Sequence, residues 1–293
     1  MAQLFELIGN TPLLDLSALC DNPGVRLFGK LEGQNPGGSV KDRAALSMIL
    51  GAWERGELDG KGIVEATSGN TGIAMAMIAA KLSVPITLIM PENSTPERVG
   101  TMRAYGAEVI LTPSDGTIEY SRQLAQEMED QRADLVQLNQ FANDDNWRAH
   151  YRTTGPEIWR DTDGQVTHFV SSMGTTGTIT GTGRYLREQS ESVRIVGVQP
   201  TDGSRIPGIR RWSPAFLPAI YDESVVHRKI DVSEVEATAM MRRLAREEGC
   251  FAGVSSGGAT AAAVRLADEL DEGLIVCIIC DRGDRYLSSG KHE

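Results

Sequence analysis

Short β-rich runs alternate with helical patterns along most of the chain, and this alternation limits the possible folds more than any other feature. The first series predicts strands over 62–67, 85–91 and 108–113, with helices over 73–82, 96–107 and 117–130. After a helical segment over 146–161, a second series predicts strands over 166–172 and 193–200 around a helix over 179–189. Units of this length favour parallel sheets with helices on both faces. The sequence therefore predicts an α/β fold with two sheets and a crevice between them.

Composition and charge exclude several classes of protein. The formal net charge is −11, which disfavours nucleic acid or an anionic membrane surface as a partner. No apolar run approaches the roughly 20 residues that a membrane helix needs, and the N-terminus lacks the pattern of a signal peptide. The 4 cysteines are too few for a disulfide scaffold and fit a reducing compartment. We therefore expect a cytoplasmic protein with no nucleic-acid or membrane partner.

The cysteines and histidines do not predict a metal site. Cys277 and Cys280 match C-x-x-C, but they lie in the apolar run LIVCIIC, which is typical of a buried strand. Side chains three positions apart in a strand point to opposite faces, so the two sulfurs are not expected to meet. His150, His168 and His227 have no spacing typical of metal ligands, and we interpret them as structural.

Lys41 lies between a turn and the predicted start of a helix, a position that an ordinary surface lysine does not require. It follows the turn-forming residues 35–38, and Ser39 is placed to cap a helix that begins beside it. A helix N-terminus disfavours a cation, and burial would also favour the neutral amine. A neutral lysine can attack a carbonyl carbon. The alternative, a surface lysine paired with Asp42 or Glu32, stays open at this point.

Two glycine-rich turns each connect a predicted strand to a predicted helix. They span residues 67–72, Thr-Ser-Gly-Asn-Thr-Gly, and residues 174–178, Gly-Thr-Thr-Gly-Thr. Backbone N–H groups that converge at a helix N-terminus bind anions, although ordinary tight turns also explain such loops. Neither turn has the Gly-Lys pair of a Walker motif. Two anion sites and one activated lysine together indicate a phosphorylated aldehyde cofactor and a carboxylate substrate.

Two other classes of function are weaker interpretations. Residues 253–257 match the G-x-S-x-G elbow of hydrolases, but the histidine that such an enzyme needs downstream could only be His292, beside the chain end. A non-catalytic binding protein on an inherited fold would have no use for an activated amine at Lys41.

Four motifs, NPGGSVKDRAA, TSGNTG, GTTGT and GVSSGG, occur in an order that resembles the fold-type II pyridoxal-phosphate enzymes. The resemblance extends from residue 8 to residue 290 and is strongest to the cysteine synthases, or O-acetylserine sulfhydrylases. PGIRRW (207–212) and ICDRGDRYL are similar to the B-type group of that family. The resemblance implies a tryptophan synthase β-like architecture and a homodimer. It also implies a smaller domain over 36–145 that moves over the substrate, and a larger cofactor-binding domain made of 1–35 and 146–293.

The resemblance assigns roles to residues of this sequence. It implies that Lys41 holds pyridoxal 5'-phosphate as a Schiff base, that Asn70 bonds the phenolic oxygen of the cofactor and that Ser255 faces the pyridine nitrogen. It implies a phosphate cradle made of Gly174, Thr175, Thr176, Gly177 and Thr178. It also implies that the carboxylate of an amino-acid substrate is held by Thr67, Ser68, Thr71 and Gln140.

The implied reaction is a β-replacement in which O-acetyl-L-serine and sulfide give L-cysteine through an α-aminoacrylate intermediate. Arg210 and Arg211 suit an anionic sulfur donor such as thiosulfate, which would give S-sulfocysteine, although they could also be ordinary surface charges. Cys280 and Asp281 are candidates for the same site. Alternatives on the same fold are a cystathionine β-synthase-like activity and a serine or threonine dehydratase.

Overall fold

The structure is a computed structural model that describes residues 3–67 and 69–292, and it contains two sheets. The strands of the larger sheet are β1 (Leu13–Asp15), β2 (Val25–Leu31), β7 (His168–Ser172), β8 (Arg194–Pro200), β9 (Arg228–Val232) and β10 (Gly273–Ile279). The strands of the smaller sheet are β3 (Gly62–Ala66), β4 (Ile86–Pro91), β5 (Glu108–Thr112) and β6 (Leu135–Val136).

The strands are connected largely by α-helices. These are α1 (Lys41–Glu54), α2 (Asn70–Leu82), α3 (Pro96–Ala104), α4 (Thr117–Gln131), α5 (Asp144–Arg152), α6 (Thr154–Asp161), α7 (Gly177–Gln189), α8 (Glu234–Glu247) and α9 (Val254–Ala267). Short 3-10 helices are η1 (Leu4–Leu7), η2 (Ser17–Leu19), η3 (Glu32–Gln34), η4 (Ser114–Gly116), η5 (Pro214–Phe216), η6 (Glu223–Val225) and η7 (Gly283–Ser289).

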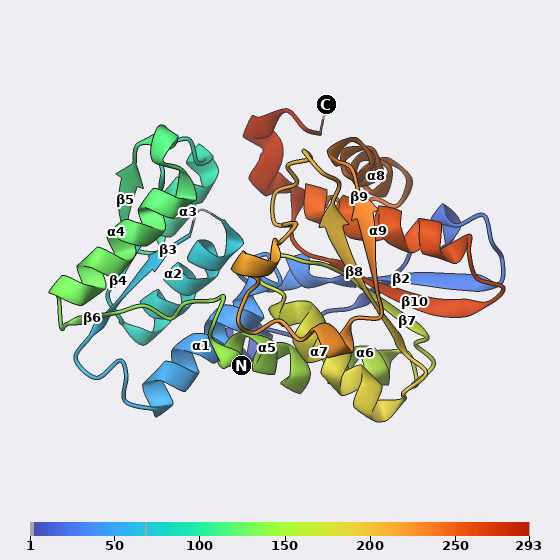
Figure 1. The fold of residues 1–293 in the computed structure, drawn as a ribbon, viewed down its shortest axis with the longest axis horizontal. Coiled ribbons are helices and arrows are strands. Elements are labelled where there is room, and N and C mark those ends of the chain that lie inside the picture. The colour runs from blue at the N-terminus through green and yellow to red at the C-terminus, as the bar shows by residue number, and fades with distance from the viewer. Residues whose placement is uncertain (1–2, 68, 293) are drawn as a thin grey trace.

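The two sheets lie side by side, each with helices on both faces (Figure 1). The larger sheet has the order β1-β2-β10-β7-β8-β9, in which β1 is antiparallel to β2 and the other neighbours are parallel. The smaller sheet has the order β5-β4-β3-β6, and its paired strands are parallel. The predicted α/β class with two mostly parallel sheets is therefore confirmed. The domain boundaries at residues 36 and 145 stay a prediction.

The smaller sheet is buried on both faces, as strand alternation requires. Ile63 and Leu88 pack with the buried side chains of α1 and α2 on one face. Val64 and Ile89 point to the other face and pack against Ala125 of α4. Because successive strand residues face opposite sides, apolar residues at consecutive positions indicate a sheet that is covered twice.

The larger sheet follows the same rule. Cys277 and Val170 belong to the core cluster beneath α8 and α9, whereas Phe169 and Val276 pack on the face covered by α6 and α7. Cys280 packs against this second cluster, so the two cysteines of the C-x-x-C pair lie on opposite faces. Both are free thiols. Cys277 is fully buried, as expected for a core residue, whereas Cys280 is only partly buried and also lines the cavity described below.

Several boundaries differ from the sequence-based expectation. The helical segment expected over 146–161 consists of two helices, α5 and α6, which meet at Thr153. Pro156 lacks the N–H group that a continuous helix would need to bond the carbonyl of Arg152, and its ring would collide with that carbonyl. Strands β1, β2 and β9 were not predicted. Among the described residues, no helix combines the length and apolarity needed to cross a bilayer.

Candidate active site

A cavity of about 1140 Å³ lies between the two sheets and receives side chains from both. Most residues that the sequence singled out line it: Lys41, Thr67, Asn70, Thr71, Gln140, Gly174, Thr175, Thr176, Thr178, Arg210, Arg211 and Ser255. Gly177 lies in the same loop but is not among the lining residues, and Ser68 lies outside the described residues. The structure thus brings together segments that are far apart in the sequence.

Lys41 is the first residue of α1, so it lies in the first helical turn as predicted, but the N-cap residue is Val40 rather than Ser39. The Oγ of Ser39 accepts a hydrogen bond from the backbone N–H of Lys41 at 3.2 Å. The side chain is half-buried and lines the cavity. Burial lowers the pKa of the Lys41 ammonium group, and the acidic groups of Cys280 and Asp281 oppose this effect only in part. The surroundings therefore favour the neutral amine.

The acidic residues that might have paired with Lys41 at the surface are bound elsewhere. Glu32 is fully buried and forms an ion pair of 2.7 Å with Arg43. Asp42 is also buried, and its Oδ2 accepts a hydrogen bond from the backbone N–H of Gly37 at 2.5 Å. The interpretation of Lys41 as an ordinary surface ion pair therefore loses its two candidate partners.

The 174–178 loop connects β7 to α7 and is shaped to receive an anion. Thr176 has a left-handed backbone conformation, with φ of +71°, at the N-cap of α7. The first amides of a helix have no backbone acceptor within the helix and can bind an anion. That of Gly177 makes only a long contact, 3.4 Å, with Oγ1 of Thr175. A Cβ on Gly174 would lie 2.6 Å from the carbonyl oxygen of Gly208, so only glycine fits there. The donor set, backbone amides and threonine hydroxyls, suits a phosphate group.

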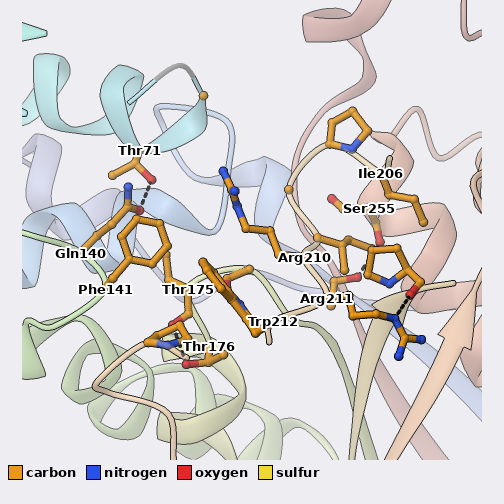
Figure 2. A pocket seen from close by; sticks show the side chains of 18 of the residues that line it. Thr71, Gln140, Phe141, Thr175, Thr176, Ile206, Arg210, Arg211, Trp212 and Ser255 are labelled. Atoms are coloured by element: carbon orange, nitrogen blue, oxygen red, sulfur yellow. Dashed lines mark hydrogen bonds between the residues drawn. The ribbon is translucent and has the colours of Figure 1, made fainter. Parts of the chain in front are cut away.

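The opposite side of the cavity carries hydroxyl and amide groups from the smaller sheet. The Thr71 hydroxyl donates to Oε1 of Gln140 at 2.7 Å, as Figure 2 shows. Gln140 therefore keeps its amide N–H groups as possible donors to a carboxylate. Thr67 is buried at the end of β3 and lines the same cavity. This cluster resembles a carboxylate site in its chemistry.

Asn70 lies in a hydrogen-bond network that the sequence did not predict. Its Nδ2 donates to Oδ2 of Asp281 at 2.7 Å, and its Oδ1 accepts from Arg285. The Tyr286 hydroxyl donates to the same Asp281 oxygen at 2.6 Å. Arg285 and Tyr286 belong to η7, far from Asn70 in the chain, so no local pattern could have indicated this contact.

Ser255 is buried in the first turn of α9 and lines the cavity. Its carbonyl oxygen accepts a hydrogen bond from Ser172 at 2.8 Å. The hydrolase interpretation would need a histidine near this serine. The ring of His292 instead packs on Phe251, with ring centroids 4.5 Å apart, and His292 is not among the described residues that line the cavity. The geometry therefore disfavours a serine hydrolase.

Arg210 and Arg211 have different surroundings. Figure 2 shows Arg210 directed toward the side of the cavity that carries Thr71 and Gln140, whereas Arg211 points away from it. The Arg211 side chain donates to the carbonyl oxygen of Pro200 at 2.8 Å and also forms ion pairs with Asp202 and Asp231. The structure thus leaves Arg210 as the arginine of this pair that faces the cavity.

An aromatic pair connects Arg210 to a second arginine that the sequence did not single out. Arg210 lies over the Trp212 ring, 5.6 Å from its centroid, and Trp212 meets Phe141 edge to face at 5.7 Å. Arg122 of α4 lies over the Phe141 ring at 4.6 Å. Both arginines line the cavity, although the chain as a whole carries a net charge of −11. The cavity therefore has basic groups on both sides.

Comparison with known proteins agrees with this geometry. The family model for "Pyridoxal-phosphate dependent enzyme" matches residues 4–281. Cysteine synthase B of Pseudomonas aeruginosa is 57% identical over 289 residues, which are 98% of this chain and 96% of that protein. The crystal structure of a cysteine synthase from Entamoeba histolytica is 34% identical with a TM-score of 0.93, covering 100% of this chain and 90% of that one. An O-acetylserine dependent cystathionine beta-synthase from Helicobacter pylori is 33% identical with a TM-score of 0.91, covering 100% and 99%.

Proposed function

This chain belongs to the pyridoxal-phosphate dependent enzyme family, and we propose that it is a cysteine synthase that makes L-cysteine from O-acetyl-L-serine and sulfide. We propose further that it accepts thiosulfate and then makes S-sulfocysteine. The observation that carries the proposal is the placement of Lys41, whose pKa is lowered by burial, in the cavity that the 174–178 loop also lines. High identity to cysteine synthase B of Pseudomonas aeruginosa supports the choice of reaction.

The residues of the cavity fit the cofactor. Lys41 would hold the aldehyde carbon, the loop from Gly174 to Thr178 would hold the phosphate, and Asn70 and Ser255 would border the ring. When bound, pyridoxal phosphate supplies an electron sink that acidifies the α-carbon of an amino acid. The protein supplies the orientation of the substrate, the proton transfers and the exclusion of water.

Lys41 also suits the proton transfers that a β-replacement needs. A lowered pKa increases the neutral fraction of the Lys41 amine, and a neutral amine can accept a proton and return it. Thr67 and the amide N–H groups of Gln140 would hold the substrate carboxylate on the opposite side of the cavity, and Thr71 would contribute by orienting Gln140. The amide of Gln140 is oriented for this by the hydrogen bond that it accepts from Thr71. A substrate that is held at its carboxylate by these residues, and at its amino group on the cofactor side, presents its α-hydrogen in a fixed direction.

The basic groups support an anionic sulfur donor. Arg210 and Arg122 both line the cavity. Arg122 lies on α4, which covers the smaller sheet, and its guanidinium group packs over the Phe141 ring. Guanidinium groups bind the oxygens of sulfonate-like anions through charge-assisted hydrogen bonds. A cavity lined by basic groups also concentrates anions near the site. In this proposal Arg211 anchors the segment that carries Arg210, because its own guanidinium is bound to Asp202 and Asp231.

A substrate panel tests the proposed function. The purified chain, loaded with pyridoxal phosphate, should form cysteine from O-acetylserine and sulfide with a higher kcat/KM than it shows for any other pair. Homocysteine in place of sulfide tests the cystathionine β-synthase-like alternative, which the structural similarity to the Helicobacter pylori protein makes worth including. Serine alone tests the dehydratase alternative through pyruvate. Pyruvate or cystathionine as the dominant product would contradict the proposal.

Location and assembly are part of the same proposal. All 4 cysteines are free thiols, which supports a reducing cytoplasm. The homodimer follows from the resemblance to the cysteine synthases, and measurement of the mass in solution tests it.

A further inference from the structure

Two buried polar side chains of α5 point at the back of the 174–178 loop. Asn146 and His150 are four residues apart and therefore lie on one face of the helix. Each is 1% exposed. Neither lines the cavity among the described residues, so neither would touch a ligand there.

Each of the two side chains contacts a threonine of the loop. The Nε2 of His150 lies 3.3 Å from Oγ1 of Thr178, and its Nδ1 lies 2.9 Å from Oγ1 of Thr154. The Nδ2 of Asn146 donates to Oγ1 of Thr175 at 3.3 Å. A chain of polar contacts therefore runs from the start of α6, through His150, to a hydroxyl that faces the cavity.

The close approach of α5 to the loop depends on two glycines. A Cβ on Gly177 would lie 2.1 Å from Oδ1 of Asn146, and a Cβ on Gly181 would lie 2.0 Å from the carbonyl oxygen of Trp147. Both distances are too short for any side chain. The sequence of the loop and of α7 is thus fitted to the face of α5 that carries Asn146 and His150.

We propose that Asn146 and His150 are positioning residues for the phosphate of the cofactor, with His150 donating from Nε2–H to Thr178. In this assignment the Thr154 hydroxyl donates to Nδ1 of His150, so Nε2 is the nitrogen that carries the proton. Thr178 then receives a hydrogen bond at its oxygen, so its own O–H is left to point at the phosphate. The inference rests on the proposed function, because it requires the 174–178 loop to hold a phosphate.

The surroundings of His150 suit this role. Burial, together with the positive charge of Arg43, lowers the pKa of His150 to about 3. The imidazole is therefore neutral at physiological pH, with one donor nitrogen and one acceptor nitrogen. A charged imidazole would donate from both nitrogens and could not accept from Thr154.

Asn146 also contacts the residue that is proposed to bind the carboxylate of the substrate. Its Nδ2 also donates to the carbonyl oxygen of Gln140 at 2.7 Å. One side chain thus contacts both the phosphate loop, at Thr175, and the residue assigned to the substrate carboxylate. Replacement of Asn146 by leucine should weaken pyridoxal phosphate binding and also raise the KM for O-acetylserine, whereas changes at His150 should act on the cofactor alone.

The affinity of the cofactor tests the inference. The full chain is titrated with pyridoxal phosphate and, separately, with pyridoxal, which lacks the phosphate. His150→Leu should raise the Kd for pyridoxal phosphate about tenfold, the effect of one hydrogen bond to a charged group, and leave the Kd for pyridoxal unchanged. His150→Gln, which can place an N–H group near Nε2, should restore most of the affinity.

Two further variants complete the experiment. His168→Leu is the matched control, because His168 makes a similar contact with Thr167 at 2.9 Å but is not among the described residues that line the cavity; its affinity for pyridoxal phosphate should equal that of the wild type. Thr154→Val removes the other end of the contact chain and should also weaken pyridoxal phosphate selectively, which keeps the test valid if His150→Leu does not fold.

The possible failures are distinguishable. An unchanged Kd in His150→Leu or Thr154→Val, or an equal loss for pyridoxal phosphate and pyridoxal, would overturn the inference and leave the proposed function intact. A wild-type chain that binds pyridoxal as tightly as pyridoxal phosphate would show that no phosphate site exists, and would overturn both.

Discussion

At the scale of single residues, burial sets the protonation of the groups around the cavity. It lowers the pKa of Lys41 and of His150, and it raises the pKa of Glu65 on β3 to about 7. The raised value persists although Oε2 of Glu65 accepts hydrogen bonds from the backbone N–H groups of Leu138 and Asn139, each at 3.1 Å. Glu65 thus supports the turn that leads to Gln140.

Glu65 predicts a pH-dependent stability. Its folded pKa of about 7 lies above the ordinary value of 4.5, so folding takes up a proton. The stabilising contribution is complete below pH 4.5 and is lost as the pH rises through 7. Relative to Glu65→Gln, the free energy of unfolding of the wild type should therefore fall by ~1.4 kcal/mol per pH unit across this range. Urea unfolding at several pH values measures the difference.

The exposed Glu127 provides a matched control for this experiment. Glu127→Gln should leave the pH dependence of stability as it is in the wild type. If Glu65→Gln also has the wild-type pH dependence, the carboxyl group of Glu65 does not titrate as the structure implies.

Arg210 predicts the choice of sulfur donor. Arg210→Ala should lower kcat/KM for thiosulfate by ~10-fold or more, since a hydrogen bond to a charged group contributes ~1.5–3 kcal/mol, and should change kcat/KM for sulfide much less. Arg122→Ala should act in the same direction, because Arg122 also lines the cavity. Steady-state kinetics with both donors measure the ratio, and an equal loss for the two donors would refute the role.

At the scale of elements, the N-terminus of α1 is fixed by a buried cluster of charges. Arg43 pairs with Glu32 at 2.7 Å and with Glu157 of α6 at 2.6 Å, and Lys30 of β2 adds a third contact to Glu157 at 2.8 Å. Burial alone would raise the pKa of Glu157, but the hydrogen bonds and charge of Arg43 hold it at about 2. The cluster ties α1, and hence Lys41, to the larger sheet.

Removal of Arg43 should therefore be costly. Arg43→Met would leave Glu32 buried without its cation, and breaking a buried pair on one side costs ~3–5 kcal/mol of unfolding free energy. Arg132→Met is the control, because its ion pair with Asp134 is exposed on both sides; its loss should cost less than ~1 kcal/mol. Denaturant unfolding measures both variants. Similar losses of unfolding free energy would show that the buried cluster stabilises the protein no more than an exposed ion pair does.

At the scale of the whole molecule, the cavity exists because two sheets meet, and contacts from both sides complete it. The last helical segment, η7, reaches across to α3 of the smaller sheet, where the Ser288 hydroxyl donates to Glu97 at 2.9 Å. Arg98 of α3 lies over the Tyr286 ring at 5.1 Å. The two sheets are thus linked near the cavity by segments far apart in the chain.

The sequence predicts the local features well and the long-range ones poorly. The β–α alternation, the start of α1 at Lys41 and the loop before α7 follow from patterns within a few residues. Strand β2 escaped prediction because Lys30 interrupts its apolar run. The distant partners Glu157 and Asp161 explain why that lysine is fully buried. The contact of Arg122 with Phe141 was missed for the same reason, since no local signal connects them.

The central claim is that Lys41 is the residue that binds the cofactor covalently. The most direct test is reduction of the pyridoxal phosphate-loaded protein with borohydride, followed by proteolysis and mass spectrometry of the labelled peptides. We expect one labelled site, at Lys41, and no stable label in Lys41→Ala. Label at one of the other lysines (Lys30, Lys61, Lys81, Lys229 or Lys291) with none at Lys41, or no label at all, would contradict the account.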